Sequence, residues 1–256
     1  MVPGHRQVHV DRAEQLAHAA DIAAARTQRR ALFLEGQEGI GKTSLLLEIY
    51  RQHTTGGVYF VDLGRMVSQV DVLNELARQA RQQEIPVPGY RTARSQFTQS
   101  AQVQVNDLRA RNSSISLVIN ASIDRSIQLT SLSDALMENL ASDARRPVIC
   151  LDGFEHCEAP MRDWLGRDLL PDLLTQPGTS VFLAGRNIPR LSQPHVSSVH
   201  TMVLPPFGVD AVQEWIDSLG FHSLKRRAVR IHDMHDGIPG LIDEFFSTHI
   251  EPHGDE

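Results

Sequence analysis

The chain has 256 residues, of which 41% are hydrophobic and 22% are charged, an ordinary composition for a globular protein. The net charge of −6 at pH 7 and the aromatic content of 5% exclude an overall basic surface rich in stacking side chains, so we expect no nucleic-acid partner. No apolar run approaches the roughly 18 residues that a membrane-crossing helix needs, and the first residues lack an apolar targeting segment. We therefore expect a cytoplasmic protein without membrane contact.

Short apolar runs with the pattern of strands alternate with helical patterns along the chain. The runs cover residues 31–35, 58–63, 148–152, 180–184 and 199–204, and the helical patterns between them cover residues 42–53, 70–83, 133–144 and 161–174. Elements that alternate in this way form α/β folds with a parallel sheet. We expect residues 31–206 to form a core around a parallel five-stranded sheet, and residues 1–30 to supply a segment and a helix that pack on it.

Residues 86–130 interrupt this alternation. Residues 91–111 are polar with helical spacing, whereas residues 116–119 and 123–129 alternate like two strands joined near residues 120–124. We expect an insertion that carries a β-hairpin. Two roles stay open for it: a solvated excursion, or a surface for assembly or a partner, because an exposed hairpin offers an edge for pairing.

The strand pattern ends near Phe207. Residues 209–219, 224–233 and 241–249 have the apolar spacing of three short helices. We expect residues 207–250 to form a small C-terminal helical lid.

A phosphate-binding motif follows the first strand. Residues 36–43 fill the Walker A pattern G-x-x-x-x-G-K-[ST] between a strand and a helix, as in P-loop NTPases with a three-layer core. The glycines let backbone N–H groups wrap the phosphates, Lys42 neutralises the β- and γ-phosphates, and the Thr43 hydroxyl ligates Mg²⁺. The predicted nucleotide-binding residues here are Gly36, Gln37, Glu38, Gly39, Ile40, Gly41, Lys42, Thr43 and Ser44.

Charged residues also follow two later strands. Asp152 ends the apolar run 148–152 in a Walker B arrangement, where it would hold Mg²⁺ opposite Thr43, and Glu155 could orient or deprotonate the attacking water. Arg186 follows the run 180–184, where a guanidinium can reach the γ-phosphate and distinguish triphosphate from diphosphate. We expect Lys42, Glu155 and Arg186 to be catalytic. The simpler alternatives are a strand-end turn for the two acids and a surface position for the arginine.

A family resemblance joins these motifs to two further segments. The stretch Val10-Asp11-Arg12-Ala13-Glu14, the Walker motifs, Arg186 and Gly237-Ile238-Pro239 together resemble the STAND class of signalling NTPases, which have AAA+ or NB-ARC-like nucleotide-binding domains. The likeness spans residues 8–249 apart from the insertion. It implies that Arg12 helps to bracket the nucleotide and that Pro239 packs on adenine, so that the ligands are ATP or ADP with Mg²⁺. It also implies slow, regulatory ATP hydrolysis, a homo-oligomer, and an effector or sensor protein as partner.

Other functions stay open at this level. Members of the resembled class are commonly longer, so the chain is either a stand-alone switch or a fragment. An AAA+ loader or initiator acting on DNA shares the core and lid, although we see no basic reading module. A P-loop kinase finds weak support in the basic cluster around Arg226 and Arg230, and an inert nucleotide-binding scaffold also fits. The guanine-reading motif Asn-Lys-x-Asp of GTPases is absent.

Overall fold

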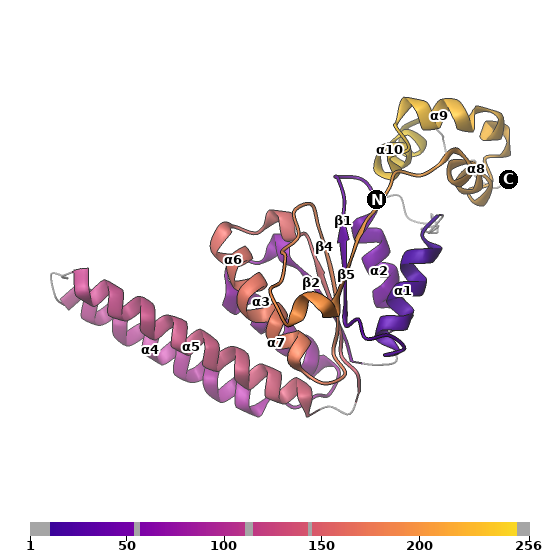
Figure 1. Cartoon of the computed structure of the whole chain (residues 1–256). Coiled ribbons are helices and arrows are strands. Elements are labelled where there is room, and N and C mark those ends of the chain that lie inside the picture. The colour runs from indigo at the N-terminus through magenta and orange to yellow at the C-terminus, as the bar shows by residue number, and fades with distance from the viewer. Residues whose placement is uncertain (1–10, 54–56, 111–114, 143–144, 250–256) are drawn as a thin grey trace.

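The computed structural model describes residues 11–53, 57–110, 115–142 and 145–249, and it is built around one parallel sheet (Figure 1). The strand order is β2-β3-β4-β1-β5. The strands are β1 Ala31–Glu35, β2 Val58–Asp62, β3 Val148–Asp152, β4 Ser180–Gly185 and β5 Val199–Val203. Each lies within one residue of the run that predicts it, and the α/β fold with five parallel strands is confirmed.

Both faces of the sheet are buried at its central strands β3, β4 and β1, which explains why these strands are continuous apolar runs, whereas the edge strand β5 is partly exposed. Successive side chains point to opposite faces. In β1, Ala31 and Phe33 pack into one hydrophobic cluster, whereas Leu32 and Leu34 pack into the other. Helices α1 (Ala13–Ala23) and α2 (Lys42–Gln52) cover the second face.

The other face is covered by α3, by the C-terminal part of α5 (Ile115–Ala141), and by two short helices in place of the single helix predicted over residues 161–174. These elements are α3 Gln69–Gln82, α6 Ala159–Trp164 and α7 Leu170–Thr175, with a π-helical segment Leu165–Leu169 joining the last two. The π-helical segment, which interrupts the α-helix, precedes Pro171, and a proline has no N–H to donate to the preceding turn.

Two glutamine side chains close the exposed edge of the sheet. Strand β2 is an edge strand, and its outer backbone groups face α3. The amide of Gln79 accepts from Phe60 N at 2.8 Å and donates to Phe60 O at 2.6 Å. Gln83 pairs in the same way with Val58 N and O, at 3.1 and 2.6 Å. Because residues four apart share a helix face, the two amides replace a neighbouring strand and leave this stretch of the edge without free pairing groups.

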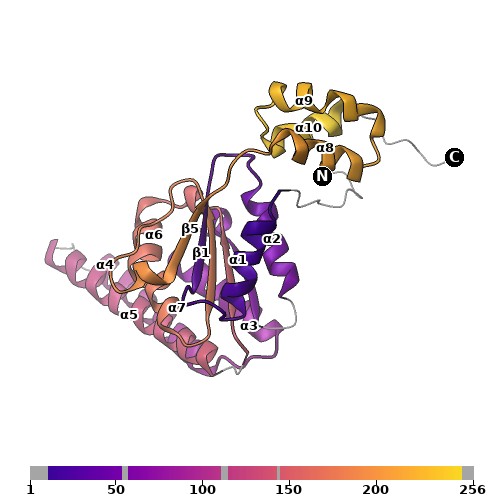
Figure 2. The ribbon, with the colours of Figure 1, turned by 45° about the vertical axis from the view of Figure 1, so that its right-hand side comes forward.

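The predicted β-hairpin in the insertion is wrong. Helices α4 Pro88–Ala110 and α5 Ile115–Ala141 run side by side as a long helical hairpin that projects from the core (Figures 1 and 2). The polar segment predicted as helical does lie in α4. The segment predicted as two strands lies inside α5, because Leu132, Leu136 and Leu140 are buried at helical spacing and anchor one continuous helix in the core.

Three helices after β5 fold around their own apolar cluster. They are α8 Val209–Ser218, α9 Ala228–Met234 and α10 Pro239–His249, with a 3₁₀ segment at His222–Arg227. Phe207, Val212, Ile216, Ile242 and Phe246 form the centre of this cluster. We call residues 207–249 the lid. It lies beyond the carboxyl ends of the strands, away from the helical hairpin (Figure 1). None of the helices described here is both long and apolar enough to cross a bilayer.

Candidate nucleotide-binding site

The phosphate loop, residues 36–43, connects β1 to α2. Gly39 and Gly41 have φ values of 75° and 93°, in the left-handed region that glycine adopts without strain. Gly41 directly precedes Lys42, the first residue of α2, and no side chain caps this helix end. The first N–H groups of α2 therefore stay available to an anion.

Lys42 lies at the centre of the loop. Its ammonium donates to the carbonyls of Gly36 and Gln37 at 2.8 and 2.9 Å, and its side chain is only 8% exposed. Glu155 Oε1 lies 3.6 Å from the same nitrogen. The cation is thus held at the loop by groups that a phosphate oxygen could replace.

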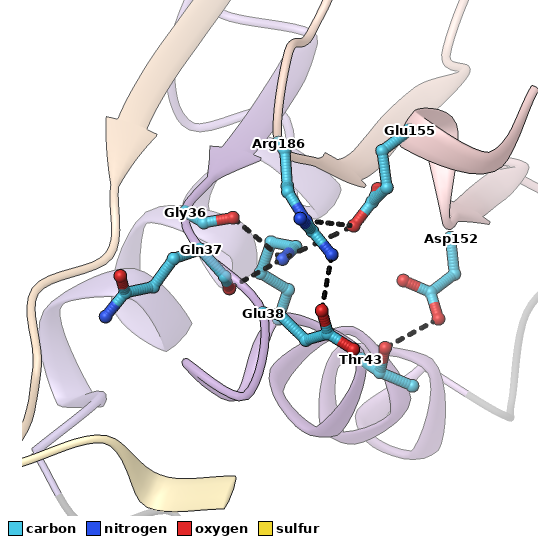
Figure 3. Close-up of polar contacts among 8 residues, drawn as sticks. Gly36, Gln37, Glu38, Thr43, Asp152, Glu155 and Arg186 are labelled. Atoms are coloured by element: carbon cyan, nitrogen blue, oxygen red, sulfur yellow. Dashed lines mark hydrogen bonds and ion pairs between the residues drawn. The ribbon is translucent and has the colours of Figure 1, made fainter. Parts of the chain in front are cut away.

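Thr43 and Asp152 meet across the sheet. The Thr43 hydroxyl donates to Asp152 Oδ2 at 2.8 Å, although the residues belong to α2 and β3 (Figure 3). Burial raises the pKa of Asp152, and the neighbouring carboxylates of Asp62 and Glu155 raise that pKa further, against the opposing hydrogen bond from Thr43. A carboxylate destabilised by burial and like charges favours a cation beside it.

This pair fits a magnesium ion. Hydroxyl and carboxylate oxygens are the ligands that Mg²⁺ prefers, and the ion usually takes only one or two protein ligands together with phosphates and water. Among the described residues, no cluster of three or more His, Cys, Asp or Glu side chains has the arrangement of a metal site. The described residues therefore contain no metal site built from such side chains alone.

Arg186 reaches from the end of β4 to two carboxylates. Its Nη2 donates to Glu38 Oε2 in the phosphate loop at 2.6 Å, and its Nε lies 3.8 Å from Glu155 Oε1 (Figure 3). Glu155 Oε2 is buried and has no hydrogen-bond partner among the residues that the structure describes. Glu38, Arg186, Glu155 and Lys42 thus form a chain of alternating charges around the loop.

Arg12 is buried where the helix α1, the phosphate loop and the lid meet. Its Nη2 donates to the carbonyls of Ile40 and Pro205 at 3.2 and 2.9 Å, and its guanidinium lies 4.8 Å from the centre of the Phe207 ring. Burial lowers the pKa of Arg12. The side chain therefore ties three segments together around the cavity that it lines.

A cavity of about 420 Å³ lies between the phosphate loop and the lid. On the lid side, Pro239 and Gly240 line it, and the backbone N–H of Gly240 donates to the carbonyl of Gly39 at 2.8 Å. A Cβ on Gly240 would lie 2.8 Å from Gly39 Cα, so only glycine permits this approach. Lid and loop are in direct backbone contact.

The structure brings most of the predicted site residues to this cavity. Those that line it are Arg12, Glu38, Gly39, Gly41, Lys42, Thr43, Ser44, Asp152, Glu155, Arg186 and Pro239. Gly36 and Gln37 take part through the carbonyls that bind Lys42. The side chain of Ile40 is placed elsewhere, buried among Leu34, Leu45 and Leu204.

Sequence reasoning missed eight residues of the cavity wall: Asp62, Gly153, His156, Phe207, Trp215, Leu219, Gly240 and Asp243. Asp62 ends β2, and its place after an apolar run was a signal that could have found it. Trp215 and Asp243 come from lid helices, where only the docking of the lid on the loop brings them to the cavity. The helical spacing of Trp215 and Asp243 in the sequence does not indicate that they line the cavity.

Comparison with protein families decides the class. A family model described as an AAA domain matches residues 25–190, which include the phosphate loop, Asp152, Glu155 and Arg186. The chain belongs to this AAA domain family. It is therefore an AAA+ P-loop NTPase, and the family generally binds ATP or ADP with Mg²⁺ and has ATPase activity.

Several solved structures share the fold of this AAA+ chain. Cdc6p from Pyrobaculum aerophilum is 16% identical, with a TM-score of 0.50, over 85% of this chain and 51% of its own length. A signal transduction ATPase with numerous domains (STAND) and a tetratricopeptide repeat sensor, from Pyrococcus horikoshii, is 13% identical with a TM-score of 0.53. That match covers 98% of this chain and 32% of the STAND protein.

A third structure is an Orc1 protein from Aeropyrum pernix in complex with DNA, 18% identical with a TM-score of 0.43 over 83% of this chain and 50% of its own. No curated protein matches the sequence. The chain thus spans about half of the Cdc6p structure and a third of the STAND structure, and identities this low show a common fold alone.

Proposed function

We propose that this AAA+ chain is an ATP-dependent switch of the STAND type in the cytoplasm. It binds ATP with Mg²⁺ between the phosphate loop and the lid, hydrolyses it slowly, and changes its oligomeric state with the bound nucleotide. The partners are further copies of the chain and an effector or sensor protein. The five motifs that resemble the STAND class support this proposal.

In this proposal the core residues handle the phosphates and the metal. The free N–H groups at the start of α2 and the ammonium of Lys42 bind the β- and γ-phosphates. Thr43 and Asp152, which are already 2.8 Å apart, hold the ion that neutralises the developing charge. Glu155 orients the attacking water through its buried, unpartnered Oε2, and Arg186 contacts the terminal phosphate.

The lid side of the cavity holds the base. Pro239 and Trp215 offer apolar surface there, and Arg12 fixes the lid entry against the loop by its bonds to Pro205 and Ile40. An adenine would pack against Pro239, as the resemblance implies.

The backbone bond between Gly39 and Gly240 carries the switch proposal. A nucleotide that bends or stiffens the phosphate loop acts directly on the lid, because the two share this 2.8 Å hydrogen bond and their backbones are too close for a side chain at Gly240. A ligand shifts a conformational equilibrium only by its differential contacts with the two states. Arg186 supplies such a difference, since a diphosphate has no γ-phosphate for it to contact.

The test is mass in solution together with hydrogen exchange of the lid. Light scattering is measured on the wild-type chain with ADP and with ATP, and on Glu155→Gln with Mg²⁺-ATP. We expect the chain to form a defined oligomer with ATP, and we expect this oligomer to last longest in Glu155→Gln. Equal mass and equal lid protection in ADP and in a non-hydrolysable ATP analogue would overturn the switch.

One observation favours a second function, action on DNA. Arg81, Arg91 and Arg94 line a shallow groove at the root of the helical hairpin with Ser95 and Thr98. In the described part of the chain, none of these three guanidinium groups forms an ion pair. Such a carboxylate-free arginine surface suits a phosphate backbone. If it binds duplex DNA, the logarithm of affinity should fall with the logarithm of salt at a slope of about −3, and Arg91→Gln with Arg94→Gln should reduce that slope.

A further inference from the structure

The inference starts from what Arg186 contacts. Its Nη2 donates to a carboxylate oxygen of Glu38 at 2.6 Å, the shorter of its two carboxylate contacts, and only its Nε faces Glu155, at 3.8 Å (Figure 3). Glu38 belongs to the phosphate loop, and Arg186 comes from the end of β4 on the neighbouring strand. The pair therefore crosses the phosphate side of the cavity, which both residues line.

Glu38 is held only loosely in this position. Its side chain is 84% exposed, and Arg186 is the partner that the described residues give it. Glu155, by contrast, is 14% exposed and lies between Lys42 and Arg186. An exposed ion pair contributes little, so the Glu38 carboxylate can leave Arg186 at small cost, whereas Glu155 stays within the site.

The chemistry of the two carboxylates therefore differs. A carboxylate and a phosphate oxygen are the same kind of acceptor for a guanidinium, with negative charge and short charge-assisted hydrogen bonds. Glu38 places such an acceptor on Nη2 of Arg186, beside the loop that binds the phosphates.

We propose that Glu38 is a specificity-determining residue that competes with the terminal phosphate of ATP for Arg186. This rests on the proposed nucleotide site and deepens it. ATP must displace the Glu38 carboxylate before its γ-phosphate reaches Arg186, whereas ADP leaves the pair intact. Glu38 thus lowers the preference for ATP over ADP and keeps Arg186 engaged until a triphosphate binds.

The test compares ratios of affinity instead of single affinities. Calorimetry in Mg²⁺ measures the Kd for ADP and for a non-hydrolysable ATP analogue in the wild-type chain, in Glu38→Gln, in Arg186→Gln and in the double variant. Glu138→Gln is the matched control, because Glu138 is exposed near the end of α5 and its loss changes the net charge by the same amount. The end of α5 leads to the amino end of β3, whereas the phosphate loop follows the carboxyl end of β1.

We expect Glu38→Gln to raise the ATP preference about 2- to 5-fold, the range for an exposed ion pair. In the Arg186→Gln background the same substitution should change the ratio by less than 1.5-fold (about 0.2 kcal/mol). Glu138→Gln should leave the ratio unchanged.

Each contrary result identifies what fails. If the wild-type chain binds neither nucleotide, the proposed function is wrong and this inference falls with it. If it binds both and Arg186→Gln lowers the ATP preference while Glu38→Gln has no effect, only the competition is wrong. An equal gain from Glu38→Gln with and without Arg186 would show a general effect of charge, which also overturns it.

Discussion

Gly240→Ala tests the contact between lid and phosphate loop. The substitution places a Cβ at 2.8 Å from Gly39 Cα, 3.1 Å from its carbonyl oxygen and 3.4 Å from its carbonyl carbon. All three atoms are backbone, so no flexible side chain can move aside. Gly240 is the second residue of α10, where alanine on its own would stabilise the helix by about 1 kcal/mol. The sign of the effect therefore depends on the contact.

The contact should decide the outcome. Overpacking costs about 1 to 3 kcal/mol, and displacing the lid also breaks the bond from Gly240 N to Gly39 O, which contributes about 0.5 to 1.5 kcal/mol. Since the lid has its own apolar cluster, it should stay folded and move off the loop. We expect the affinity for ATP to fall roughly tenfold, because about 1.4 kcal/mol of lid docking is lost from binding.

The assay is calorimetry with ATP together with hydrogen exchange of α10. Gly208→Ala is the control, since a Cβ there meets no atom within 4 Å and the backbone φ of −74° suits alanine. An unchanged Kd and unchanged lid protection in Gly240→Ala would refute the reasoning that lid and loop act as one unit.

Three further predictions concern the edge, the metal site and the hairpin. Gln79→Ala with Gln83→Ala should lower the free energy of unfolding by about 2 to 6 kcal/mol, because each of the four lost hydrogen bonds contributes about 0.5 to 1.5 kcal/mol. The double variant should also become more turbid on heating, since the edge of the sheet is then open to pairing. Gln82→Ala, at an exposed position of the same helix, should change neither quantity. Asp152→Asn should stabilise the protein against urea near pH 7 and should weaken Mg²⁺-dependent ATP binding. The pKa of Asp152 is raised in the folded state, so the stability that its protonated form contributes is lost as the pH rises from the unfolded to the folded pKa. A loss of stability in Asp152→Asn near pH 7 would contradict this. Leu136→Ala should cost about 2 to 5 kcal/mol in urea unfolding, because α5 buries this side chain fully in the core; a change below 0.5 kcal/mol would contradict that packing.

The centre of the sheet could be predicted because its strands β1, β3 and β4 are short apolar runs buried on both faces. Such runs differ clearly from the amphipathic helices around them, and parallel strands bring their carboxyl ends to one side. The sequence therefore predicts that Lys42, Asp152 and Arg186 belong to one site. All three line the same cavity, and their roles stay predictions.

The helical hairpin could not be predicted in this way, because the period of its apolar residues is ambiguous. Ile123, Ile127 and Leu129 fit alternation, yet Ile123 and Ile127 are also one helical turn apart. Ile127 is 60% exposed, so it marks neither pattern by burial. The helix is decided further along, where Leu132 and Leu136 are buried against the core, and tertiary packing of this kind overrides the strand propensity of β-branched residues.

The charges of the cavity explain why a metal ion and a competing carboxylate belong to one mechanism. Five carboxylates line it against three cationic side chains: Glu38, Asp62, Asp152, Glu155 and Asp243 against Arg12, Lys42 and Arg186. Arg12 is already bound to two backbone carbonyls, so it adds little to the attraction of a phosphate. A triphosphate therefore enters a cavity whose own charge opposes it. The pKa of Asp152 is raised first by burial, and the neighbouring carboxylates of Asp62 and Glu155 raise it further. Thr43 and Asp152 would hold a Mg²⁺ ion that offsets this excess on one side, and the proposed release of Glu38 would offset it on the Arg186 side, so both would be needed before the γ-phosphate could be held.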